Sequence, residues 1–134
     1  MYQNFLDVYV SNIYEKLKEI DLLVKTAEGG IITVHEAAAA LCISTDSIRA
    51  IMAQKNISRL TKKAFFVVMA EGESDICALY QREVRCGSPF TYTREDVAYI
   101  YDLNLDTINE TCDKLGIRAV SAHTLPALFA RLPA

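Results

Sequence analysis

Basic and hydroxyl side chains gather between residues 44 and 63 of this chain of 134 residues. Ser44, Thr45 and Arg49 carry groups that donate hydrogen bonds to base edges, and Arg49 is the best candidate for a guanine contact. The side chains suited to phosphate contacts are Lys55, Arg59, Lys62 and Lys63. The stretch holds five basic residues and one acidic residue, a balance of +4. It predicts a surface for double-stranded DNA, with a solvated face that ends in lysines as the alternative interpretation.

Two short helices joined by a tight turn are expected to position these side chains. Thr33, with Glu36 three residues later, forms a capping box for a first helix that runs to about Leu41. Cys42 and the next residue form the turn, and Ser44 caps the second helix. Small and apolar residues occupy the helix-turn-helix packing positions, namely Ala37, Ala38, Leu41, Ile43, Ile48 and Ile51. After an extended stretch at 57–60, Thr61 is expected to cap a third helix over 62–70.

The same plan recurs 60 positions later, because residues 33–70 and 93–130 align without a gap. Six positions are identical in this register, with Thr33, Ala38, Asp46, Ile48, Ile57 and Ala70 matching Thr93, Ala98, Asp106, Ile108, Ile117 and Ala130. In the second copy Thr93 and Asn104 are expected to cap helices, and Gly116 to end one. Ser121 is expected to cap the last helix, in which Pro126 would form a kink or mark a later start.

The second copy differs from the first in charge. Between residues 104 and 123 two basic residues stand against three acidic ones, a balance of −1. Such a surface repels phosphate. We therefore expect the second copy to serve packing or contact with a protein partner.

The opening segment, from residue 2 to 28, is expected to form a long amphipathic helix that ends at Gly29 and Gly30. Apolar residues follow each other in alternating steps of four and three, as in a heptad seam, at Leu6, Val10, Ile13, Leu17, Ile20 and Val24. This spacing predicts a homodimer through the seam. Packing on the chain's own core is the alternative, because further apolar residues widen the stripe.

The fold class predicted from these patterns is all-α, with the long N-terminal helix followed by two helix-turn-helix trihelical units and a connecting helix between them. The expected segments are the N-terminal helix at 1–30, module one at 31–72, the connecting helix at 73–89 and module two at 90–134. Within the connecting segment, the helix is expected over 75–85 and closes at Gly87, Ser88 and Pro89.

Bulk composition is that of a globular chain, with 51% hydrophobic and 23% charged residues. No apolar run approaches the roughly 18 residues that a membrane helix needs, and no segment resembles a signal peptide, so a cytoplasmic location is expected. The net charge of −3 is the opposite of what a general nucleic-acid binder carries.

Enzyme chemistry is not expected, because no nucleophile, base and oxyanion set can be assembled from the motifs. His35 and His123 lie without a carboxylate cluster, so neither a metal nor a cofactor is predicted. The cysteines, Cys42, Cys77, Cys86 and Cys112, show no paired CxxC spacing and are expected to be free thiols, with a disulfide or metal site as the alternatives.

The string TVHEAAAALCISTDSIR, from Thr33 to Arg49, resembles the opening of the MerR and excisionase-type helix-turn-helix families. A threonine cap, a Glu-Ala-Ala stretch and a serine-capped recognition helix recur in those families. The string TREDVAYIYDLNLDTI of module two resembles the same pattern more distantly. Those families usually place a small wing after the second helix, and residues 57–60 could form only a minimal one.

The resemblance implies DNA binding in gene regulation or mobile-element recombination, and not catalysis. We therefore expect a small dimeric DNA-binding regulator or mobile-element accessory factor that reads double-stranded DNA with module one. The alternative is a protein-protein interaction module on a helix-turn-helix scaffold without DNA affinity, which the acidic net charge and module two favour.

Overall fold

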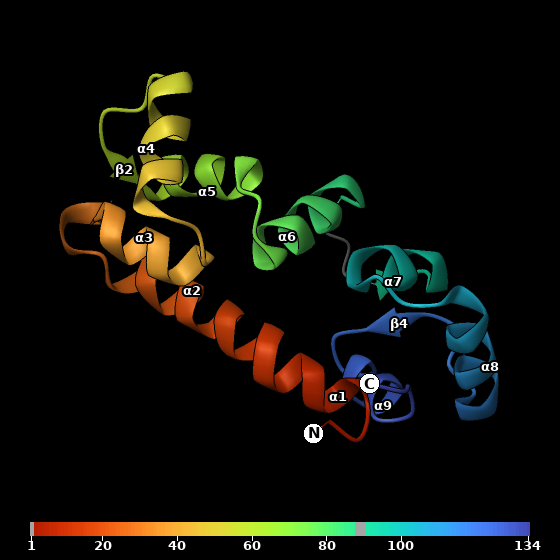
Figure 1. Ribbon diagram of the computed structural model, residues 1–134. Coiled ribbons are helices and arrows are strands. Elements are labelled where there is room, and N and C mark those ends of the chain that lie inside the picture. Colours follow the sequence, from red (N-terminus) through yellow and green to blue (C-terminus); the bar gives the residue numbers. More distant parts are fainter. Residues whose placement is uncertain (1, 88–90) are drawn as a thin grey trace. The chain divides into compact units, whose positions relative to one another are not determined.

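A computed structural model describes residues 2–87 and 91–134, and most of these residues are helical (Figure 1). The predicted all-α class is confirmed, with two small antiparallel sheets of two strands each added to it. The contacts divide the chain into two compact units. One consists of the residues up to Tyr14 together with Arg82–Ala134, and the other of Glu15–Gln81.

The N-terminal segment is helical over most of its predicted length. It consists of α1 (Phe5–Val8), a π-helical stretch η1 (Tyr9–Tyr14) and α2 (Glu15–Thr26). The side-chain oxygen of Asn4 caps α1 by accepting a hydrogen bond from the backbone N–H of Asp7 at 3.2 Å. A 3-10 turn, η2 (Glu28–Gly30), follows α2, and Gly29 adopts a left-handed conformation there (φ 61°).

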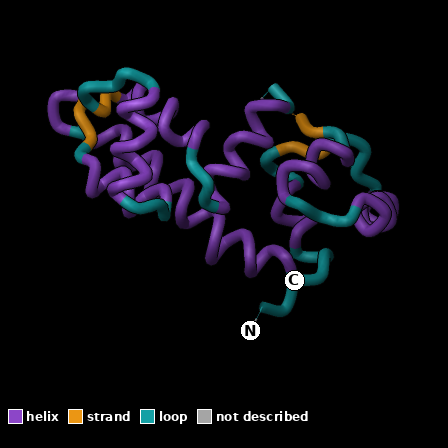
Figure 2. Tube along the Cα trace, turned by 45° about the horizontal axis from the view of Figure 1, so that its top comes forward, coloured by secondary structure: helices purple, strands orange, loops and turns teal. Residues whose placement is uncertain are grey.

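Module one contains the two predicted short helices with a turn between them, and a sheet that the sequence did not predict. Its elements are β1 (Ile31–Ile32), α3 (Val34–Leu41), α4 (Thr45–Gln54), β2 (Leu60–Thr61) and α5 (Lys62–Glu71). The two strands are antiparallel, with Ile31 opposite Thr61 and Ile32 opposite Leu60, and so join the start of α3 to the start of α5 (Figure 2). The buried side chains of the module include Ile32, Ala37, Ala40, Leu41, Ile48, Leu60, Phe65, Val68 and Met69.

The helix α6 (Asp75–Arg85) coincides with the helix predicted in the connecting segment. Gly72 precedes it in a crowded place, since a Cβ there would lie 2.6 Å from Sγ of Cys77. Gln81 on α6 donates from Nε2 to the carbonyl oxygen of Gly72 at 2.9 Å. This bond gives a partner to a backbone carbonyl at the end of α5 that has none within the helix. Of the predicted closing residues, Gly87 is left-handed (φ 78°), whereas Ser88 and Pro89 lie outside the described residues.

Module two repeats the arrangement with β3 (Thr91–Tyr92), α7 (Arg94–Tyr101), α8 (Leu105–Leu115), β4 (Val120–Ser121) and α9 (Leu125–Phe129). The prediction that Ser121 caps the last helix is wrong. Ser121 belongs to β4, and its backbone N–H donates to Oγ1 of Thr124, the residue that precedes α9, at 2.8 Å. The helix starts later because Pro126 has no backbone N–H. It fits only in the first turn of a helix, where a backbone N–H has no intrahelical acceptor.

Backbone features of the two modules coincide at the offset of 60. Cys42 and Asp102 end the first helices in left-handed conformations (φ 58° and 55°), and Asn56 and Gly116 follow the second helices in the same way (φ 57° and 70°). The strand registers also match, with Ile31 opposite Thr61 and Thr91 opposite Ser121. The two modules therefore share one backbone plan, in agreement with the alignment of their sequences.

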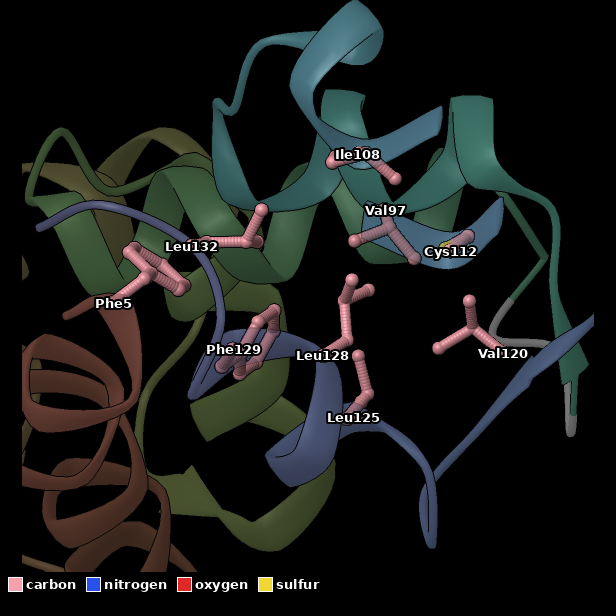
Figure 3. Packing of buried hydrophobic residues seen from close by; sticks show 9 residues of the cluster. All are labelled: Phe5, Val97, Ile108, Cys112, Val120, Leu125, Leu128, Phe129 and Leu132. Carbon is pink, nitrogen blue, oxygen red and sulfur yellow. The ribbon is translucent and has the colours of Figure 1, made fainter. Parts of the chain in front are cut away.

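Module two encloses a hydrophobic core that the N-terminal residues complete (Figure 3). Phe5 of α1 packs edge-on against Phe129 of α9, with ring centroids 4.8 Å apart. The backbone N–H of Phe5 donates to the carbonyl oxygen of Leu132 at 2.8 Å. The chain's two ends are thus tied together within one unit.

Candidate nucleic-acid interface

Local hydrogen bonds set the orientation of α4, the predicted recognition helix. Thr33 and Glu36 form the predicted capping box at the start of α3, and the hydrogen bond that the Thr33 backbone N–H donates to the Glu36 carboxylate lowers the pKa of Glu36. Cys42 turns the chain in its left-handed conformation. The hydroxyl of Ser44 then accepts from the backbone N–H of Ser47 at 3.1 Å, which caps α4 as predicted. Ser44, Asp46 and Ser47, at the start of α4, are exposed.

One face of α4 is buried and the other is exposed. Ile48 is fully buried, and Ile51 and Met52 are partly buried beside it. The exposed face bears mostly small or polar side chains, namely Asp46, Ser47, Arg49, Ala50, Ala53 and Gln54. Small residues on an outward helix face allow close approach to another surface. Arg49 and Gln54 supply the hydrogen-bonding groups.

Six of the seven residues predicted to contact DNA are exposed, and they lie at the cap of α4, on α4, at the start of α5 or between these helices. The exposed six are Ser44, Arg49, Lys55, Arg59, Lys62 and Lys63, whereas Thr45 is partly buried. Arg49 lies 3.8 Å from the carboxylate of Asp46, one turn earlier on α4. Lys55 forms an ion pair with Glu71 at 3.1 Å. A phosphate at Lys55 would compete with the carboxylate of Glu71. This ion pair was not predicted from the sequence.

A groove with a volume of about 270 Å³ runs along one side of α4. The partly buried Ile43 and Ile51 contribute apolar surface to it. The remaining lining comes from α4 and from the chain at the end of α5, with Ser47, Ala50, Gln54, Glu71, Gly72 and Glu73. The expected end of the third helix at residue 70 did not predict that residues 71–73 line a groove. The one available signal was the pair of acidic residues around a glycine.

Module two presents different chemistry at the equivalent place. Arg94 of α7 lies across α8, with its guanidinium 3.0 Å from the carboxylate of Asp113. The same group donates to the amide oxygen of Asn109 at 3.4 Å and to the carbonyl oxygen of Ile117 at 2.9 Å. At the offset of 60, Val34 of module one takes the place of Arg94. The contacts of Arg94 were not predicted, and their one sequence signal is a cation directly after the cap Thr93.

The predicted dimerisation residues are largely engaged within the chain itself. Leu6 and Ile13 pack against the core of module two, and Ile20 of α2 is buried. Leu17 and Val24 are partly buried, and Val10 is 43% exposed. Lys16 also ties α2 to α3 by donating from Nζ to the carbonyl oxygen of Ala39 at 3.0 Å, near the end of that helix. This packing favours the intramolecular alternative, and the homodimer stays a prediction.

The four cysteines are free thiols. Within residues 2–87 and 91–134, no three His, Cys, Asp or Glu side chains are grouped so that they could hold a metal ion. None of the helices described in these ranges is both long enough and apolar enough to cross a membrane. Comparison with known proteins found no match to the chain among protein-family models, curated proteins or solved structures.

Proposed function

We propose that the protein binds double-stranded DNA through module one, as a small transcriptional regulator or a mobile-element accessory factor. The observation that carries the proposal is the exposed face of α4, which holds Arg49 and is followed by four exposed cations at residues 55–63. Hydrogen-bonding groups for base edges and positive charges for phosphates therefore lie on consecutive elements of one module.

The dimensions of α4 support this use. An α-helix with its side chains is about 10–12 Å across, and the major groove of DNA is about 12 Å wide. Ala50 and Ala53 on the outward face add little to the helix diameter. In this proposal Arg49 contacts a guanine, after exchanging the carboxylate of Asp46 for the base edge.

The contrast between the two modules supports a division of roles. At the offset of 60, Arg49 is replaced by Asn109, Ala50 by Glu110 and Ala53 by Asp113. The face of α8 that is equivalent to the exposed face of α4 is therefore acidic. We assign DNA binding to module one alone, and packing or protein contact to module two.

Anisotropy titration of a labelled random-sequence duplex tests the proposal, because phosphate contacts precede any knowledge of a target site. We expect binding at low salt that weakens steeply as salt is added. Replacing Arg49 by asparagine, its counterpart in module two, should weaken binding to a selected target site by about 1 to 3 kcal/mol. The matched control is Arg118→Ala, which removes an exposed cation from module two. Folded protein that fails to bind at low salt would contradict the proposal.

The second candidate function is a protein-interaction module without DNA affinity. The groove beside α4 favours it, because Glu71 and Glu73 place two carboxylates near the proposed DNA surface. A failed DNA titration with folded protein would favour this candidate. A DNA titration in which Arg49→Asn weakens specific binding and Arg118→Ala does not would exclude it.

A further inference from the structure

The groove of module one suits a protein side chain better than a small molecule. Its volume of about 270 Å³ lies below the roughly 300–1,000 Å³ of small-molecule sites. Ile43 and Ile51 offer apolar surface, and Glu71 and Glu73 add carboxylates. The complementary occupant is an aliphatic side chain with cations on either side of it.

The end of α8 in module two carries such a side chain. Leu115 is the last residue of the helix and is 37% exposed. Lys114 precedes it and Arg118 follows three residues later, and both are exposed. Gly116 ends the helix in a left-handed conformation (φ 70°), so Leu115 lies where the chain turns away from α8.

Three other exposed large aliphatic side chains in the described residues match the groove less well. Val10 is 43% exposed, but no lysine or arginine lies within four positions of it. Val84 on α6 is 51% exposed and lies between Arg82 and Arg85. The guanidinium groups of these arginines already donate to the carbonyl oxygen of Ile100 and the hydroxyl of Tyr99. Leu22 on α2 is 62% exposed but follows an acidic residue, Asp21, which is paired with a lysine.

We propose that Leu115 of one copy of this protein inserts into the groove of a second copy. Lys114 and Arg118 then face Glu71 and Glu73. Glu71 already has an ion pair with Lys55, so Glu73 supplies most of the new charge complementarity. The contact joins two different surfaces, so two copies can exchange Leu115 reciprocally in a closed dimer, or successive copies can add head to tail.

This association would compete with the DNA binding proposed above. Ser47, Ala50 and Gln54 line the groove and also belong to the exposed face of α4. A copy seated in the groove would therefore cover part of that face. Only this competition depends on the proposed DNA function, and the association can be tested without DNA.

Analytical ultracentrifugation of the full chain over a wide range of concentration tests the contact. The weight-average mass should rise with concentration from the monomer value of 15.0 kDa to that of the dimer or beyond it. Leu115→Ser should weaken association about tenfold or more, since it removes the buried aliphatic group. Leu22→Ser is the matched control, because it removes a more exposed leucine outside the contact.

A charge exchange identifies the two surfaces. Glu73→Lys and Lys114→Glu should each associate less than the wild type, because each variant sets like charges against one another. An equimolar mixture of the two variants should associate again, since the altered groove of one meets the altered helix end of the other. Circular dichroism melting checks that each variant is folded.

Three results would overturn the proposal. A wild-type chain that stays monomeric at millimolar concentration would leave the groove to a different cationic partner. Association that stops at the dimer and is unchanged by Leu115→Ser would place the contact elsewhere, for example on the N-terminal helix. A mixture of the charge variants that associates no better than its components would refute the pairing of the two surfaces.

Discussion

The salt dependence of DNA binding can be worked out from the cations of module one. Four exposed side chains are proposed to meet phosphates, namely Lys55, Arg59, Lys62 and Lys63. Each phosphate contact contributes about −0.9 to the slope of log affinity against log salt, so four contacts give about −3.6. Raising the salt from about 50 to about 200 mM should then weaken binding about 150-fold.

Lysine substitutions should reduce this slope in steps. Lys62→Ala leaves about three contacts and a slope of about −2.7, so that the same change in salt weakens binding about 40-fold. The double variant Lys62→Ala, Lys63→Ala leaves a slope of about −1.8 and a loss of about 12-fold. Both side chains are exposed at the start of α5, so their removal should leave folding unaffected.

Fluorescence-anisotropy titrations of a labelled random duplex at several salt concentrations measure the slope. Arg118→Ala is the control, because it also removes one positive charge, but from module two. Its slope should equal that of the wild type. If the double lysine variant keeps the wild-type slope while it still binds, the start of α5 does not contact phosphate. If Arg118→Ala lowers the slope, module two takes part in binding and the assignment to module one is wrong.

Three further predictions concern single contacts. Glu71→Gln should strengthen DNA binding at low salt, because it frees Lys55 from a 3.1 Å ion pair that a phosphate contact must otherwise displace; an unchanged titration would remove Lys55 from the interface. Phe129→Ala should lower the free energy of unfolding by about 3–5 kcal/mol in denaturant titrations, since Phe129 is fully buried, whereas the partly exposed Phe66→Ala should cost less. Burial raises the pKa of Tyr101 above that of a tyrosine in the unfolded chain, which is about 10. Above about pH 10 the unfolded chain therefore loses this proton more readily than the folded chain, and the free energy of unfolding should fall as the pH rises. Alkaline unfolding followed by circular dichroism should be less steep in Tyr101→Phe, and an equal slope in both proteins would contradict this origin.

Helix caps were the most predictable part of the fold, because they depend on residues three positions apart. Thr33 with Glu36, and Thr93 with Asp96, form complete capping boxes. Asn104 accepts from the backbone N–H of Thr107 at 3.0 Å, as its residue type suggests. Ser121 failed as a predicted cap because Pro126 moves the start of α9 further along the chain. A residue type that favours a cap does not by itself decide which turn begins the helix.

Longer-range features could not be predicted from local pattern. Each strand has only two residues, too few to show the alternation that marks a half-buried strand. The heptad seam of the N-terminal segment correctly indicates an apolar stripe. Nothing in the spacing tells whether that stripe packs on a second copy or on the chain's own core, because both arrangements bury the same residues.

For the candidate interface, sequence gives the charges and structure gives their partners. The balance of +4 in module one is a property of composition alone. The ion pair between Lys55 and Glu71 joins residues 16 positions apart across two helices, so only the fold reveals it. The groove arises in the same way, because it needs the face of α4 beside the chain that follows α5.

The two modules differ in the packing of their side chains as well as in their surface charge. Arg94 connects α7 to Asn109 and Asp113 on α8 and to the carbonyl of Ile117 beyond it, and its side chain is only 23% exposed. Removing the carboxylate of Asp113 would make the surface less acidic, but it would also take an anionic partner from a largely covered guanidinium. In module one the equivalent of Arg94 is Val34, and the exposed face of α4 can change without such a cost. Because both copies share a backbone plan, the difference lies in the side chains. Substitutions on the surface of α8 disturb the contacts of Arg94, whereas substitutions on the exposed face of α4 disturb no equivalent contact.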